Sequence, residues 1–127
     1  MSRRDVLGDL RDCVDNAERV LSIAAGMTYE DFVGDYVRRG AIERYLINAS
    51  EAVWQITKAD PNVASRISDT EKISTFRHIL VHRYFAVEPR TVWEVATIRV
   101  RTLSEQAGQL LSELESAAES DENSAPF

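Results

Sequence analysis

Five side chains that can move protons or bind anions occur together between positions 77 and 84: Arg77, His78, His82, Arg83 and Tyr84. The surrounding run, from 73 to 87, otherwise resembles an apolar core. Histidine exchanges protons near neutral pH, and arginine can hold a phosphate through two parallel hydrogen bonds. The stretch is therefore either an active site or an amphipathic helix whose polar residues face solvent.

Cleavage of RNA is one chemistry that this set of side chains can perform. RNA carries its own nucleophile, the 2′-hydroxyl. A histidine that takes its proton and an arginine that stabilises charge on the phosphate are sufficient without a metal, and the product would end in a 2′,3′-cyclic phosphate. His78 and His82, four residues apart, also have the spacing of a metal-binding pair. No convincing third ligand accompanies them, so we expect no metal and no cofactor.

Helical geometry decides which of these side chains can meet. Each residue turns about 100°, so Arg77 and Tyr84 share a face, and His78 and His82 share another. About 140° separates Arg77 from His82. One straight helix would not bring that pair onto one phosphate. Either the helix loosens near His82, or a second copy of the chain completes the site.

The elements that must position this stretch are helices. Glycine is scarce, proline occurs three times, and no alternating strand pattern persists. Apolar residues at the spacing of helix packing predict an antiparallel four-helix bundle, an all-α fold. The predicted main helices cover about 2–25, 34–59, 69–88 and 89–117.

Local signals predict the connections between these helices. Thr28 and Asp31 have the spacing of a capping box and predict a short extra helical turn. Residues 60–69 form the longest predicted interior loop, and Ser68 or Asp69 can cap the helix that follows. In that helix we expect one buried stripe, made of Ile73, Phe76, Leu80 and Tyr84.

Two further residues of the predicted helices are interpreted from their neighbours. Cys13, the single cysteine, lies among apolar residues and is interpreted as a packing residue. Glu51 lies beside the apolar face of the second helix. A solvated edge charge is its simpler interpretation, and a partner for an arginine from another helix is the alternative.

Composition bounds the class of protein. The chain has 127 residues, enough for one domain, and a formal charge of −6. Five of the six net negative charges fall in residues 113–127, so we expect a folded domain over 1–117 and an acidic disordered tail over 118–127. No apolar run approaches the roughly 20 residues of a membrane span, and no signal peptide is evident, which favours a cytoplasmic protein.

Four residues separate Arg77 from His82, and one residue separates His82 from Tyr84. This spacing resembles the R-x4-H-x-Y motif of the HepT-like branch of the HEPN superfamily. The resemblance spans roughly residues 3–112. Phe32, the segment Ser50-Glu51-Ala52 and Trp93 also fit that branch. His78 stands where asparagine is common, and Ser50 where glycine is common.

The resemblance implies a HEPN ribonuclease that is the toxin of a type VII-like toxin–antitoxin pair, active without a metal on transfer or messenger RNA. Arg77 and His82 would be the catalytic pair, meeting across a homodimer interface. His78 and Arg83 are our candidates for binding RNA, and Arg38, Arg39 and Arg44 are further candidates. The implied antitoxin is an MntA-like nucleotidyltransferase, which would neutralise the toxin by transferring AMP to Tyr84.

Two other functions remain open from the sequence. One is a non-catalytic subunit that binds a nucleotide or a nucleotidyltransferase, with Arg77 and His82 only holding phosphate. The other is a purely structural dimerisation module, which would give the polar cluster no role.

Overall fold

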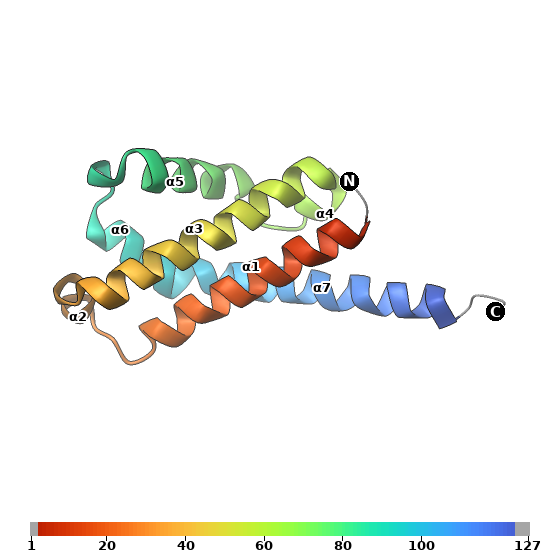
Figure 1. Ribbon diagram of the computed structural model, residues 1–127, viewed down its shortest axis with the longest axis horizontal. Helices are drawn as coiled ribbons and strands as arrows, with labels where there is room; N and C mark the ends of the chain where they lie inside the picture. Colours follow the sequence, from red (N-terminus) through yellow and green to blue (C-terminus); the bar gives the residue numbers. More distant parts are fainter. Residues whose placement is uncertain (1–2, 124–127) are drawn as a thin grey trace.

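The computed structural model describes residues 3–123, and over that range it contains helices and no strand. Figure 1 shows three long helices running side by side, with a shorter fourth helix above them. The long helices are α1 (Arg3–Ala24), α3 (Tyr36–Ala59) and α7 (Val100–Asn123), and the shorter one is α5 (Thr70–His82). α1 packs against α3 and α7, and α5 packs against α3. Chain direction alternates along these contacts, so the predicted antiparallel all-α bundle is confirmed.

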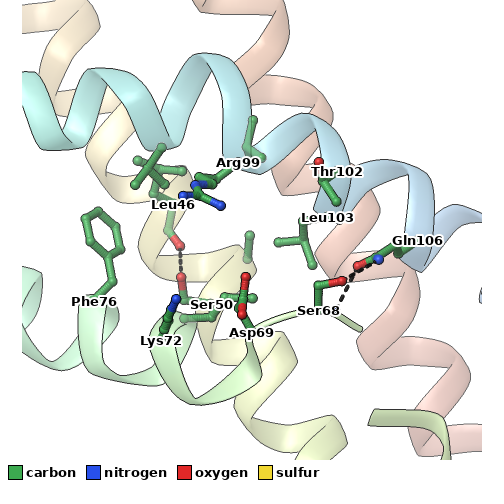
Figure 2. A pocket seen from close by; sticks show the side chains of 14 residues that line it. Leu46, Ser50, Ser68, Asp69, Lys72, Phe76, Arg99, Thr102, Leu103 and Gln106 are labelled. Carbon is green, nitrogen blue, oxygen red and sulfur yellow. Dashed lines mark hydrogen bonds between the residues drawn. The ribbon is translucent and has the colours of Figure 1, made fainter. Parts of the chain in front are cut away.

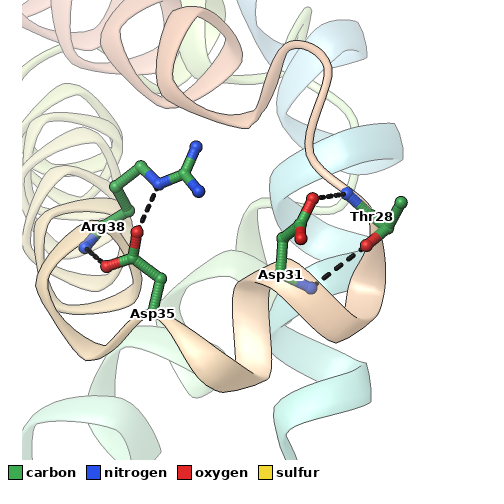
Figure 3. Close-up of polar contacts among 4 residues, drawn as sticks. All are labelled: Thr28, Asp31, Asp35 and Arg38. Carbon is green, nitrogen blue, oxygen red and sulfur yellow. Dashed lines mark hydrogen bonds and ion pairs between the residues drawn. The ribbon is translucent and has the colours of Figure 1, made fainter.

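The turn between α1 and α3 follows the local sequence signals. Gly26 has a φ of 78°, a left-handed conformation that glycine adopts without strain. The predicted capping box then opens α2 (Tyr29–Gly34): the Asp31 amide donates to Thr28 Oγ1 at 3.1 Å, and the Thr28 amide donates to Asp31 Oδ2 at 3.0 Å. Asp35 caps α3 by accepting from the Arg38 amide at 3.0 Å (Figure 3). These caps fix where α3 begins.

The buried face of α1 includes Leu10, Cys13, Ala17 and Val20, whereas Val14 is only partly buried. α1 lies between α3 and α7 and buries a face against each. The interpretation of Cys13 as a packing residue is confirmed.

Two expectations about the ends of the predicted helices were wrong. The loop predicted at 60–69 contains α4 (Pro61–Ala64), because the Asp60 carboxylate accepts from the amides of Asn62 and Val63. The tail predicted from residue 118 is helical through Asn123, as the last part of α7. Residues 124–127 lie outside the described range.

The predicted last helix is interrupted near its start. α6 (Pro89–Glu94) leads into a five-residue π-helical turn, η2 (Val95–Arg99), before α7 begins. At the junction of η2 and α7, Arg99 is exposed and Val100 is buried in the core. α5 is followed by a 3₁₀ turn, η1 (Tyr84–Ala86).

Candidate active site on α5 and η1

Arg77 lies on the side of α5 that faces α3. Its Nη1 is 3.1 Å from Glu51 Oε2, and only 23% of its side chain is exposed. Its Nε is buried and has no hydrogen-bond partner among the described residues. Glu51 is therefore paired with an arginine from another helix, and its simpler interpretation as a solvated edge charge was wrong. The glutamate restrains where the guanidinium can point.

The two histidines lie together on the outer side of the same helix. His78 and His82 are exposed, and their ring centroids are 4.7 Å apart, as the i, i+4 spacing predicts. α5 is a continuous α-helix from Thr70 to His82, so it does not loosen before His82. The angular separation of about 140° between Arg77 and His82 therefore remains within one chain.

Tyr84 is not part of the buried helical stripe that the sequence predicts. Arg83, at φ −136° and ψ 48°, ends α5, and Tyr84 begins η1 with 53% of its surface exposed. Its hydroxyl donates a hydrogen bond of 3.3 Å to Glu43 Oε1 on α3. Burial, followed by the nearby Glu43 carboxylate, raises the pKa of Tyr84 above its usual value.

Glu43 is the residue of this region that sequence reasoning missed. Burial raises its pKa, against the lowering effects of the Tyr84 hydrogen bond and of Arg39. Glu43 and Glu51 are eight residues apart on α3, close to two turns, and Arg77 and Tyr84 are seven apart. The signal available in the sequence was that Glu43 and Glu51 are separated by nearly the same number of residues as Arg77 and Tyr84. It became meaningful only once α3 and α5 were known to be neighbours.

The rest of the motif region is open to solvent. Arg83 is exposed, and no ion pair or side-chain hydrogen bond of its guanidinium occurs within residues 3–123. Two apolar side chains nearby are also exposed, Val81 by 43% and Phe85 by 88%. Apolar surface of this kind beside a polar cluster is typical of a surface that another molecule covers.

Metal binding and membrane insertion gain no support from the described residues. No group of three or more His, Cys, Asp or Glu side chains is placed to hold a metal ion there. Within the same part of the chain, no helix has the length and apolar character to cross a bilayer.

Comparison with known proteins shows that the chain is similar to ribonucleases. The profile of the family described as "Ribonuclease HepT-like" matches residues 14–110, which include the whole segment from Arg77 to Tyr84. No solved structure matches the chain significantly.

Two curated relatives illustrate the similarity. A protein of Methanocaldococcus jannaschii named "Putative RNase" is 28% identical over 124 residues, covering 98% of this chain and 99% of the relative. A protein of Caldanaerobacter subterraneus subsp. tengcongensis with the same designation is 33% identical over 102 residues, covering 80% of this chain and 87% of the relative.

Proposed function

The chain belongs to the HepT-like ribonuclease family, and on that premise we propose that it is a metal-independent endoribonuclease whose catalytic pair is Arg77 and His82. One observation carries the proposal. Glu51 holds the half-buried guanidinium of Arg77 on one side of α5, while His82 is exposed at the end of the same helix. An oriented cation and an accessible proton carrier are the two groups that metal-free RNA cleavage needs.

The proposed reaction is an attack of the RNA 2′-hydroxyl oxygen on the adjacent phosphorus. The bond from phosphorus to the 5′-oxygen breaks, which leaves a 2′,3′-cyclic phosphate and a 5′-hydroxyl. One proton leaves the 2′-hydroxyl, one reaches the departing 5′-oxygen, and His82 carries proton transfer. Arg77 stabilises the negative charge that builds on the phosphate oxygens. His78 and Arg83, both exposed beside this pair, bind the RNA backbone.

A homodimer is part of the proposal, because the catalytic pair diverges within one chain. Arg77 points towards α3, whereas His82 lies on the outer side of α5. A second copy placed against this face would bring the two motifs together. The exposed side chains of Val81 and Phe85 support such an interface, since a partner would remove their apolar surface from water.

The partner we propose is an MntA-like nucleotidyltransferase, in a toxin–antitoxin pair that acts in the cytoplasm. The Tyr84 oxygen would attack the α-phosphorus of ATP, pyrophosphate would leave, and the phenolic proton would pass to Glu43. The exposed tyrosine and its hydrogen bond to Glu43 support this role. An added AMP would place negative charge two residues from His82 and compete with RNA for Arg77 and Arg83.

The decisive experiment is RNA cleavage in EDTA. Wild type, His82→Ala and His78→Ala are incubated with total RNA, after intact mass has shown that Tyr84 is unmodified. We expect cyclic phosphate ends from the wild type and a loss of about 10²- to 10⁴-fold in His82→Ala. We expect a smaller loss in His78→Ala, seen mainly in KM.

Two results would contradict the proposal. Undiminished cleavage by His82→Ala would remove His82 from the chemistry. No cleavage by an unmodified wild type would favour a non-catalytic subunit that binds a nucleotidyltransferase.

A further inference from the structure

A pocket of about 250 Å³ lies between α5, α3 and the start of α7, and neither Arg77 nor Glu51 lines it. Its wall is mostly apolar and includes Leu46, Phe76 and Leu103 (Figure 2). None of the residues from Arg77 to Tyr84 lines it. Ligand pockets in proteins usually span about 300–1,000 Å³, so this pocket suits a small ligand.

Two cations stand at this pocket, Lys72 from α5 and Arg99 from η2. Figure 2 shows the Arg99 guanidinium directed into the space between the helices. Among residues 3–123, neither cation has an ion pair with a carboxylate. Asp69 also lines the pocket and offsets one of the two charges. The lining therefore carries a net positive charge in a chain whose net charge is −6.

Two of the backbone irregularities in the described part of the bundle border this pocket. Asp69, at φ 58°, is the single non-glycine residue with positive φ in the described chain. The π-helical turn η2 contributes Val95 and Arg99 to the lining. π-turns and strained backbone occur frequently at functional sites, because a regular helix would be more stable. Here the wider turn places Arg99 at the pocket while Val100 is buried in the core.

We propose that this pocket binds a small organic anion, made of an aromatic or alicyclic body and one carboxylate, sulfonate or phosphate group. The body would rest against Phe76 and Leu103, and the anionic group would pair with Arg99 and Lys72 at the mouth. A ligand held there contacts α5 on one side and η2 with α7 on the other. The ligand therefore bridges α5 to η2 and α7, which have few direct contacts with α5. Binding in this position stabilises the fold. The proposal does not depend on ribonuclease activity.

The test uses 1-naphthalenesulfonate as the probe and isothermal titration calorimetry as the measurement, with 1-naphthalenemethanol as its neutral analogue. We expect saturable binding of one probe molecule per chain and a melting temperature that rises with probe concentration. Arg99→Gln should weaken sulfonate binding by about threefold to tenfold, because it removes a partly solvated ion pair. The neutral analogue should bind wild type and Arg99→Gln equally.

The matched control is Arg101→Gln, which removes the same charge from an exposed residue of α7 that does not line the pocket. Its affinity for the sulfonate should equal that of wild type. Thr102→Phe, at an exposed position on the rim, should block the probe without disturbing the core. Absence of saturable binding to folded wild type, or an equal loss in Arg99→Gln and Arg101→Gln, would overturn the proposal.

Discussion

Arg77 on α5 and Glu51 on α3 form an ion pair of 3.1 Å across the interface between their helices. The arginine side chain is 23% exposed and the glutamate side chain 45%, so the pair is partly shielded from water. One guanidinium nitrogen contacts the glutamate, and Nε is buried and has no hydrogen-bond partner within residues 3–123. The pair therefore orients Arg77 while leaving part of its hydrogen-bonding capacity unused.

Glu51→Gln should lower kcat for RNA cleavage roughly tenfold and change KM less, because a misplaced guanidinium weakens stabilisation of the transition state more than binding. The melting temperature should change little, since partly exposed ion pairs contribute about 0–1 kcal/mol. Steady-state cleavage of a short RNA measures both constants. The matched control is Glu71→Gln, at an exposed position in the first turn of α5, which should cleave like wild type. Equal kcat values in the two variants would show that Glu51 does not position Arg77.

Glu43→Gln should slow AMP transfer to Tyr84, because the amide can still accept the phenolic hydrogen bond but cannot take its proton. Intact mass after incubation with the cognate nucleotidyltransferase and ATP measures transfer. Tyr84→Phe should accept no AMP, and Tyr36→Phe, which alters another exposed tyrosine, should be modified normally. Full modification of Tyr84→Phe would place the acceptor elsewhere.

The same Glu43→Gln variant tests the electrostatics of this carboxyl group. Its pKa is raised in the folded state, so its contribution to stability is present below the unfolded value of 4.5 and is lost as pH rises. Relative to wild type, Glu43→Gln should gain melting temperature between pH 4 and pH 7. A constant difference over that range would mean that burial of Glu43 has no energetic consequence.

Phe85→Ser should weaken the proposed homodimer by about 10- to 100-fold, which corresponds to about 1.5–3 kcal/mol for the burial of one large apolar side chain. Sedimentation velocity over a range of concentrations measures the dissociation constant, and cleavage should fall with the dimer fraction. Ile98→Ser is the matched control, because Ile98 is 62% exposed but lies on η2. A dimer unaffected by Phe85→Ser would require a different interface.

The sequence was sufficient to predict the helices and several of their ends, because those depend on local chemistry. The capping box of Thr28 and Asp31 involves only residues 28–31. The spacing of apolar residues defines which face of a helix is buried. The helical structure of residues 118–123 was not predicted, because the acidic charge of this segment obscured the helix propensity of its alanine and glutamates. The cap from Asp60, next to Pro61, was likewise overlooked.

The candidate site was only partly predictable, because its geometry depends on contacts between helices. The spacing of the residues correctly predicted that Arg77 lies on one face of α5 and that His78 and His82 share another. The exit of Tyr84 from the helix carries no glycine or proline signal, since the next proline is Pro89. Its pairing with Glu43 follows from the packing of α5 on α3, which one sequence does not specify.

Cys13 provides a test of the core that is independent of function. It is buried in the core, and burial, followed by the charge of Asp12, raises the pKa of its thiol from 9.0 to about 12. Because folding raises the pKa of the Cys13 thiol, protonated Cys13 contributes to the free energy of unfolding. This contribution is complete below pH 9 and is lost as pH rises towards 12, because the unfolded chain releases the proton first.

Between pH 7 and about pH 10.5, wild type should therefore lose about 2 kcal/mol of unfolding free energy more than Cys13→Ala. Urea unfolding of both proteins at the two pH values measures the difference. Cys13→Ala is less stable at pH 7 because it leaves a small cavity, but that cost is the same at both pH values and cancels. In wild type, a thiol reagent at pH 8 should label Cys13 only after urea is added. Rapid labelling of the folded protein, or parallel pH profiles for the two proteins, would show that α1 does not hold this thiol in a closed core.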